Sequence, residues 1–466
     1  GAFKARVAPL NVNYRYVEEE LLYLLKDSQA RAIVYHAEFA PILEKIRSRL
    51  PDLEVLLQVS DESGNGLLPG AVEYEAALDS VSADRPDVSW SPDDLYILYT
   101  GGTTGMPKGV LWRSADIYVA AMGGRKFDGS EQESLEGIVE AARAGGSQRS
   151  MPCPPLMHGA SQWVSFGLMG GGETIILQDN PRRLDGADLI STMERERVTL
   201  ALIVGDAFAR PILDAMREAQ KRNADLSSLM MLASGGAPLS TAHKEEMLEL
   251  MPNLIVMDSI GSSETGAQGS NPSSKAMGVS TGSFKPGPGA GVVSEDLTRV
   301  LGPDDREMGW FSQQGRVPLG YLNDAEKTAR TFPNIEGTRW SIPGDRARFQ
   351  DDGGIEVLGR DSVTINSGGE KIFAEEVEHA LKLHPGVYDA VVCGRPSERW
   401  GQEVVAIVRL REGQTTTEAE LLDECGKHLA RYKFPKEFLF REEIVRSPSG
   451  KADYRWAKAQ VTGAAD

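Results

Sequence analysis

A run of glycines and threonines between Tyr99 and Gly109 carries the strongest chemical signal in the sequence. Its eleven residues, YTGGTTGMPKG, contain four glycines and three threonines and begin at the end of an apolar stretch at 94–100. Glycines let backbone N–H groups turn toward an anion, and Lys108 adds a positive charge. The run is not a Walker A loop, because it lacks the GxxxxGK[ST] pattern. It predicts a phosphate-binding loop of another kind, and a flexible turn is the alternative. The residues of the predicted loop are Thr100, Gly101, Gly102, Thr103, Thr104, Gly105 and Lys108.

Seven further segments combine small, acidic and basic residues in ways that also suit nucleotide chemistry. They are PLMHG at 155–159, SGGAP at 234–238, SIGSSETG at 259–266, WSIPGD at 340–345, GRD at 359–361, SGGEK at 367–371 and PSGK at 448–451. Each segment alone has an ordinary explanation. A single histidine is most often structural, an aspartate after glycine is commonly a turn residue, and a lysine near a chain end is usually solvated. Their order along the chain is what favours a shared function.

Together, the glycine-rich run and these segments resemble the motif series of the adenylate-forming superfamily, which includes acyl-CoA synthetases, adenylation domains and insect luciferases. The run is similar to that family's signature YTSGTTGxPKG, with Gly101 where the family usually has serine. The ordered motifs extend over essentially the whole chain, so chance agreement is negligible. The resemblance implies an enzyme that activates a carboxylic acid with ATP.

By this resemblance, the segments before residue 300 contact the acid, the nucleotide and its metal. His158 lines the acyl pocket, and Glu264 holds Mg²⁺ near the ATP phosphates. A turn along the adenine is made by Gly235, Gly236, Ala237 and Pro238. The segment that ends at Glu264 places a hydroxyl on a phosphate and an apolar side chain against the adenine, where Ile260 replaces the usual tyrosine. Its members are Ser259, Ile260, Gly261, Ser262 and Ser263.

The later segments imply a ribose site, a hinge and two lysines with separate tasks. Asp345 accepts hydrogen bonds from the ribose hydroxyls, and Arg360 donates in the same region. Lys451 bridges the acid's carboxylate and the α-phosphate during adenylation. A hinge and a second loop serve thioester formation, and their residues are Asp361, Gly368, Gly369 and Lys371.

The elements that must position these residues follow an α/β pattern. Apolar runs rich in β-branched residues alternate with stretches of helical period, which predicts parallel strands covered by helices. The expected strands lie at 31–36, 53–59, 94–100, 174–178, 199–206, 229–236 and 254–259. After about residue 260, frequent glycine and proline predict a β-rich subdomain. We therefore predict an adenylation domain at 1–360 and a small, mobile α+β domain at 361–466.

The composition limits the partners. Lys and Arg total 50 against 68 Asp and Glu, and the net charge of −18 has the wrong sign for nucleic acid. The three cysteines and six histidines show no CxxC or HxxxH spacing, so neither a disulfide framework nor a zinc site is expected, and a cytoplasmic location fits. No run approaches the roughly 18 apolar residues of a membrane span.

We predict an acyl-CoA ligase that uses ATP, Mg²⁺ and CoA. The phrases TGGTTGMPKGVLWR, SGGAPLS and DSIGSSETGAQG look most like actinobacterial ligases of fatty acids and steroid side-chain acids, which implies a hydrophobic acid. Trp163 and Phe166 either line an acyl tunnel or belong to the core.

Several alternatives stay open from the sequence. One is another adenylate-forming enzyme, either luciferase-like or loading a carrier protein. Another is a non-catalytic nucleotide-binding homologue, and the assembly state, including a homodimer, is open. The opening GAFKARVAPLNVNYRY resembles a segment well inside the N-terminal domain of relatives, so we expect part of that domain to be missing upstream.

Overall fold

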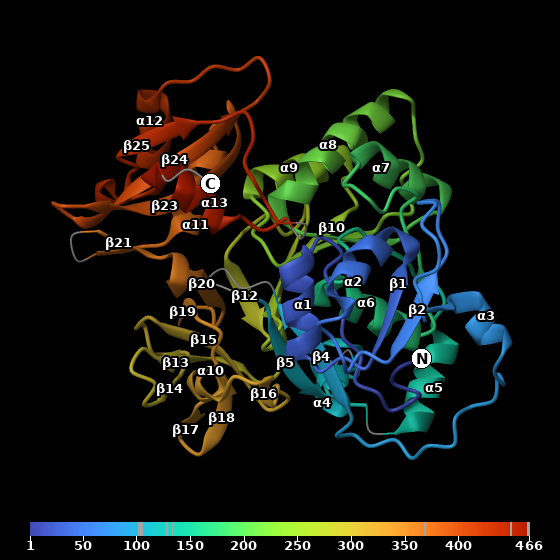
Figure 1. The fold of residues 1–466 in the computed structure, drawn as a ribbon. Coiled ribbons are helices and arrows are strands. Elements are labelled where there is room, and N and C mark those ends of the chain that lie inside the picture. The colour runs from blue at the N-terminus through green and yellow to red at the C-terminus, as the bar shows by residue number, and fades with distance from the viewer. Residues whose placement is uncertain (101–105, 127–128, 133, 368–369, 448–449, 464–466) are drawn as a thin grey trace. The chain divides into compact units, whose positions relative to one another are not determined.

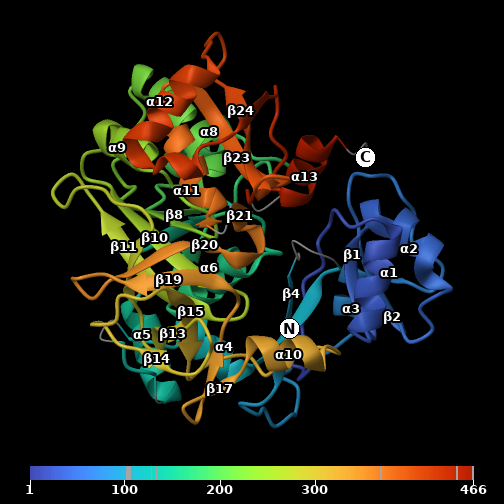
Figure 2. The same cartoon turned by 90° about the vertical axis from the view of Figure 1, so that its left-hand side faces the viewer.

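The protein is represented by a computed structural model that describes residues 1–100, 106–126, 129–132, 134–367, 370–447 and 450–463 (Figure 1). The chain forms two compact units. The first comprises residues 1–116 and 318–330, and the second comprises 117–317 and 331–466. Each unit is seen from a second direction in Figure 2.

The first unit contains two three-stranded sheets and several short helices. Its strands are β1 (Ala32–His36), β2 (Val55–Val59), β3 (Val72–Glu73), β4 (Leu95–Thr100), β5 (Lys108–Arg113) and β16 (Gly320–Tyr321). Its helices are α1 (Glu18–Asp27), α2 (Ala40–Arg47) and α3 (Tyr74–Asp79), with most of α10 (Ala325–Thr331) and a 3₁₀ turn, η1 (Ala37–Phe39). Helix α4 (Ser114–Ala121) begins here and ends in the second unit. One sheet is parallel in the order β1-β2-β3, and the other has the order β16-β5-β4.

The prediction that residues 94–100 form a strand is confirmed, but the expected parallel pairing is wrong. Strand β4 pairs antiparallel with β5, from Leu95 opposite Arg113 to Thr100 opposite Lys108. The physical reason is the short connection between the two strands. A parallel partner would need a crossover of a dozen or more residues, whereas β4 ends at Thr100 and β5 already begins at Lys108.

A single 14-stranded sheet dominates the second unit. Its strands are β6 (Arg149–Pro152), β7 (Thr174–Ile175), β8 (Leu200–Ile203), β9 (Met231–Gly235), β10 (Ile255–Ser262), β11 (Gly266–Ser273), β12 (Ser283–Pro286), β13 (Ala290–Ser294), β14 (Val300–Leu301), β15 (Gly309–Gln314), β17 (Asn334–Ile335), β18 (Thr338–Ser341), β19 (Asp345–Phe349) and β20 (Ile355–Arg360). The strands β7-β6-β8-β9-β10 are parallel, and β10 then pairs antiparallel with β11. The predicted parallel and β-rich parts therefore join at β10.

Helices pack on the parallel part of this sheet because their apolar residues recur on one face. The helices that do so are α7 (Gly186–Arg195), α8 (Gly205–Lys221) and α9 (Thr241–Leu250), whereas α5 (Leu135–Ala144) has no buried residue and α6 (Gly159–Gly170) lies outside this cluster. Leu189 of α7, Ile212 of α8 and Met247 of α9 share one buried cluster with Ala201 and Leu232 of the strands. The Gly205 amide at the start of α8 donates to Ser234 Oγ near the end of β9 at 3.1 Å, so the amino end of α8 lies beside the predicted adenine turn.

Residues after 360 build a small α+β body with its own core. Its strands are β21 (Ile365–Ser367), β22 (Glu370–Ile372), β23 (Val387–Ser397), β24 (Gly401–Leu410) and β25 (Glu437–Phe440). Its helices are α11 (Ala374–Lys382), α12 (Glu418–His428) and α13 (Tyr454–Thr462), with 3₁₀ turns η2 (Asp361–Val363) and η3 (Arg431–Lys433). The sheet order is β22-β21-β24-β23, with β25 parallel to β24. The α+β character predicted for this region is confirmed.

Candidate active site

The predicted adenine turn lies where two parallel strands end together. Gly235 at the end of β9 is the register partner of Ser259 in β10. Gly236 follows with φ at +89°, a conformation that a side chain would strain. The turn continues through Ala237 to Pro238, whose carbonyl accepts a hydrogen bond from the Asp206 amide at 3.2 Å. A small-residue turn here therefore leaves exposed backbone at the carboxyl edge of the sheet, the usual ligand edge of such folds.

Glu264 lies in a tight turn between β10 and β11. The Glu264 amide donates to Ser262 Oγ at 3.2 Å, and the Ser262 amide donates to Thr265 Oγ1 at 2.9 Å. Ser341 Oγ also donates to the Glu264 carbonyl at 2.6 Å. Glu264 is only 9% exposed. These contacts fix the backbone that presents its carboxylate, and Ile260 and Gly261 lie at the bulge just before the turn.

Asp345 and Arg360 face one another across β19 and β20. They are register partners, and Arg360 Nε donates to Asp345 Oδ1 at 3.1 Å. Asp345 raises the pKa of the Arg360 guanidinium above its usual range, and Glu264 acts in the same direction. The predicted ribose residues are thus one ion pair within electrostatic reach of Glu264.

Lys451, near the C-terminal end of the chain, lies close to the adenine turn and interacts with Glu264 and the Asp345–Arg360 pair. Its Cε lies 3.6 Å from the position that a Cβ on Gly236 would occupy. Burial lowers the pKa of Lys451, and Arg360 lowers it further, whereas Glu264 and Asp345 oppose both effects. The residue is surrounded by protein yet remains accessible to solvent. An accessible ammonium among these four residues can contact an anion in the same place.

His158 is the residue immediately before α6, and it interacts electrostatically with Lys451. Burial, and then the charge of Lys451, lowers the pKa of His158 to about 4, so the ring is neutral near pH 7. Its Nε2 is buried and has no hydrogen-bond partner among the residues described. On the same helix, Trp163 is buried and Phe166 is exposed. A neutral histidine is compatible with the predicted acyl pocket.

The remaining predicted site residues have other partners or lie outside the described residues. Lys108 forms an ion pair with Asp324 inside the first unit, beside Thr100 at the end of β4. Lys371 donates to Glu295 Oε1 at 2.6 Å. Asp361 is exposed at the start of η2, and its amide donates to the Gly344 carbonyl at 3.0 Å. The predicted residues Gly101, Gly102, Thr103, Thr104, Gly105, Gly368 and Gly369 lie outside the described residues.

The loop that carries Lys451 is fastened by residues that the sequence analysis did not single out. Arg446 donates from Nε and Nη2 to the two carboxylate oxygens of Asp389, both at 2.8 Å, and from Nη1 to the Gly450 carbonyl at 3.0 Å. Gly450 has φ at +75°, and a Cβ added there would lie 3.3 Å from side-chain atoms of Ala207 and Phe208 in α8. Arg446 therefore holds the backbone directly beside Lys451.

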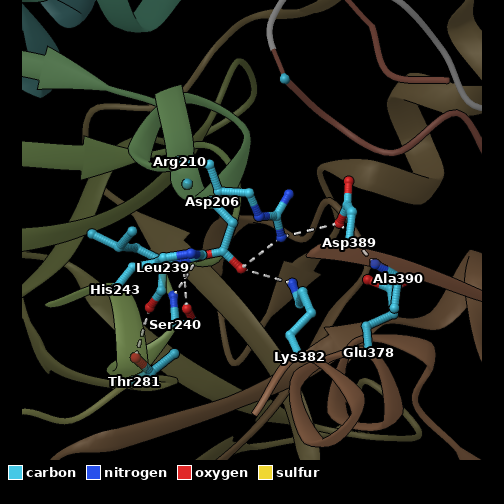
Figure 3. Close-up of polar contacts among 12 residues, drawn as sticks. Asp206, Arg210, Leu239, Ser240, His243, Thr281, Glu378, Lys382, Asp389 and Ala390 are labelled. Carbon is cyan, nitrogen blue, oxygen red and sulfur yellow. Dashed lines mark hydrogen bonds and ion pairs between the residues drawn. The ribbon is translucent and has the colours of Figure 1, made fainter. Parts of the chain in front are cut away.

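A buried network extends this attachment to the amino end of α8 (Figure 3). Arg210, 4% exposed, lies 3.2 Å from Asp389 Oδ1 and 3.7 Å from Asp206 Oδ2. Lys382 of α11 lies 3.0 Å from the same Asp206 oxygen, and His243 of α9 lies 2.8 Å from Asp206 Oδ1. Buried charges of this kind are tolerated only when paired, so the network fixes residues after 360 against α8 and α9.

The donor set fits magnesium bound together with a nucleotide. Within the described part of the chain, no three or more His, Cys, Asp or Glu side chains are grouped as a metal site. Mg²⁺ is commonly held by one or two carboxylates with phosphate oxygens and water. Glu264 is a carboxylate within electrostatic reach of Lys451 and Arg360, so the residues present fit such an ion.

No helix in the described ranges combines the length and the apolar character needed to cross a membrane.

Comparison with known proteins agrees with this arrangement. The family described as AMP-binding enzyme matches residues 1–309, and the AMP-binding enzyme C-terminal domain matches 376–451. The medium-chain acyl-CoA ligase Mig of Mycobacterium avium is 54% identical over 99% of this chain and 83% of its own length. A medium/long-chain-fatty-acid and 3-oxocholest-4-en-26-oate CoA ligase of Mycolicibacterium smegmatis is 42% identical over 98% of this chain and 83% of its own length.

Solved structures share the fold. ATP-bound MatB from Rhodopseudomonas palustris superposes with a TM-score of 0.80 at 23% identity, covering 98% of this chain and 84% of that one. Because the identity is this low, the match supports a shared fold and nothing further. The relatives and the fold confirm the predicted α/β architecture and the predicted acyl-CoA ligase class. The chain belongs to the AMP-binding enzyme family.

Proposed function

We propose that this chain converts a hydrophobic carboxylic acid to its CoA thioester through an acyl-adenylate, with Lys451 as the adenylating lysine. The observation that carries the proposal is the grouping of Lys451 with Gly236, Glu264, Asp345 and Arg360. The named substrates of the relatives, medium- and long-chain fatty acids and 3-oxocholest-4-en-26-oate, support an apolar acid.

In the first half-reaction, a carboxylate oxygen attacks the α-phosphorus of ATP and pyrophosphate leaves. A carboxylate is a poor electrophile, and the new bond gives it AMP as a leaving group. Lys451 binds the attacking carboxylate and an α-phosphate oxygen, which offsets the negative charge that accumulates in the transition state. Asp345 accepts hydrogen bonds from the ribose, and the turn from Gly235 to Pro238 lies along the adenine.

Magnesium supplies positive charge to the leaving pyrophosphate when it is bound. We assign Glu264 as its protein ligand because Mg²⁺ prefers carboxylate oxygens and usually keeps phosphate and water ligands as well. The backbone contacts of Glu264 with Ser262 and Ser341 hold that carboxylate in place. The loop from Thr100 to Lys108 is assigned to the β- and γ-phosphates.

In the second half-reaction, the CoA thiolate attacks the acyl carbon and AMP leaves. We assign this step to Lys371 and the loop at 367–371, after rotation of residues 361–466 about Asp361. The position of Lys451 beside Gly236, with Lys371 paired to Glu295, supports assigning this conformation to the first half-reaction. The boundary between 1–360 and 361–466, the cytoplasmic location and a homodimer stay predictions.

Acid-dependent release of AMP tests the proposal. Acetate, octanoate and a steroid side-chain acid are offered with Mg·ATP, first without CoA and then with it. We expect AMP and thioester with octanoate or the steroid acid. A clear preference for acetate would refute a hydrophobic substrate, and adenylate without thioester would favour a carrier-loading or luciferase-like enzyme.

A further inference from the structure

Two buried ion pairs join helix α8 to the small α+β body that follows residue 360 (Figure 3). Lys382 Nζ, at the end of α11, lies 3.0 Å from Asp206 Oδ2 of α8. Arg210 Nη2 of α8 lies 3.2 Å from Asp389 Oδ1 of β23. Each of the four side chains is at most 8% exposed. Each side of the contact contributes one cation and one anion, so the two pairs are reciprocal.

The acceptor of the first pair is held in place independently of Lys382. Asp206 Oδ1 accepts a hydrogen bond from the Ser240 amide at 2.8 Å and lies 2.8 Å from His243 Nδ1. These contacts engage Oδ1, and Lys382 approaches the other oxygen, Oδ2. Arg210, one turn along α8, lies 3.7 Å from that same oxygen. The two α8 charges therefore keep a partner on their own side when Lys382 departs.

The two charges on the other side also have partners of their own. Asp389 accepts two hydrogen bonds from Arg446, both at 2.8 Å. Lys382 interacts electrostatically with Glu378, one turn earlier on α11. A buried charge left alone is strongly destabilising, and a partner on the same side offsets that cost when the two sides separate. This arrangement suits a contact that opens and closes better than a permanent core contact.

We propose that Lys382 is a positioning residue that holds residues 361–466 in the adenylation conformation through Asp206, and that releasing it favours thioester formation. An interaction made in only one of two conformations shifts their balance by its own free energy. The Lys382 pair is made where Lys451 lies beside Gly236, and rotation about Asp361 separates it. This inference rests on the proposed two-step function and adds to it the contact that sets the balance between the two steps.

The test measures the two half-reactions separately in Lys382→Met, Lys382→Arg and a surface control, Lys427→Met. Methionine keeps the apolar stem without the charge, and arginine keeps the charge. Lys427 pairs with Glu424 in the same small body, but its side chain is 63% exposed. Acid-dependent ATP–pyrophosphate exchange at matched folded concentration reports adenylation, with the acid that releases most AMP from the wild type. Mixing enzyme-bound acyl-adenylate with CoA gives the first-order rate constant of thioester formation in a single turnover.

The decisive quantity is the thioester rate constant divided by the exchange rate. Because each rate scales with the population of its own conformation, the ratio changes by the full factor in the balance. We expect Lys382→Met to raise the ratio by roughly 5–150-fold, the usual range of coupling between two states, with a thioester rate constant no lower than in the wild type. Lys382→Arg and Lys427→Met should keep the wild-type ratio.

An unchanged ratio in Lys382→Met, or a thioester rate constant that falls with exchange, overturns the inference while wild-type exchange upholds the ligase function. Wild-type protein that exchanges pyrophosphate with no acid overturns both. If Lys382→Met does not fold, Arg210→Met is judged by the same ratio, because it removes the other pair while Asp389 keeps Arg446.

Discussion

Replacing Arg446 with methionine tests how the fold positions Lys451. Arg446 makes two charge-assisted hydrogen bonds to Asp389 at 2.8 Å and one to the Gly450 carbonyl at 3.0 Å. Methionine keeps much of the apolar stem but removes all three bonds. Asp389 would then keep Arg210, at 3.2 Å, as its remaining close cation.

The size of the effect follows from the charge of Asp389. Burial alone would raise the pKa of Asp389, but Arg210 and Arg446 lower it from 3.8 to about 2. A depressed acid pKa contributes stability above about pH 4, and that stability is lost as the pH falls toward 2. The shift corresponds to roughly 2–3 kcal/mol, shared between the two arginines. Because Arg446 also holds the loop, we expect Arg446→Met to lower the free energy of unfolding by about 2–4 kcal/mol.

The assay distinguishes a misplaced Lys451 from a loss of folding stability. Misplacing a catalytic group by about 1 Å can cost roughly 100-fold in rate, so acid-dependent ATP–pyrophosphate exchange should fall by about 10–100-fold. Thioester formation from a supplied acyl-adenylate should fall much less, because that step is assigned to Lys371. Arg195→Met is the matched control, since Arg195 pairs with Asp179 and Glu196 on the surface. Equal losses in both half-reactions, or normal exchange in a destabilised Arg446→Met, would refute the positioning role.

Three further predictions concern single carboxylates. Glu264→Gln should slow AMP release by roughly 10²–10³-fold with little change in thermal unfolding, and a normal rate at low Mg²⁺ would contradict the assignment. Asp345→Ala should raise KM for ATP by roughly 10–100-fold more than it lowers kcat, since a charge-assisted bond to the ribose is lost, and an unchanged KM would argue against a ribose contact. Burial, and then Glu378, raises the pKa of Glu375 from 4.5 to about 8, so its stabilising contribution is present below about pH 4.5 and is lost as the pH rises through 8. Glu375→Gln should therefore lose less stability than wild type between pH 5 and 8 in denaturant titrations, and parallel profiles would contradict this.

Periodicity in the sequence placed most of the parallel strands but missed β3 and β6. The apolar runs at 31–36, 53–59 and 254–259 overlap β1, β2 and β10, because strands buried on both faces are continuously apolar. The pairing of β4 was not predictable from its own residues. A buried apolar strand looks the same in either direction, and only the short return to β5 decides the partner.

The site residues were also predictable only in part. Glu264, Asp345, Arg360 and Lys451 were identified through motifs, and the fold brings them together. The pairing of Lys108 with Asp324 has no local signature, because the two residues are distant in the sequence. The same holds for Asp206, Arg210, Lys382 and Asp389, whose charges read as ordinary helix or strand residues until folding places them in one buried network.

Lys451→Ala gives the most direct test of the central claim, that separate segments of the chain converge on one nucleotide and an acid carboxylate. The measurement is acid-dependent ATP–pyrophosphate exchange by wild type and variant at matched folded concentration. We predict robust exchange by the wild type and a loss of roughly 10²–10³-fold in the variant, with thioester formation from supplied acyl-adenylate largely retained. Exchange by Lys451→Ala at the wild-type rate, or wild-type protein that never exchanges pyrophosphate with any acid, would contradict it.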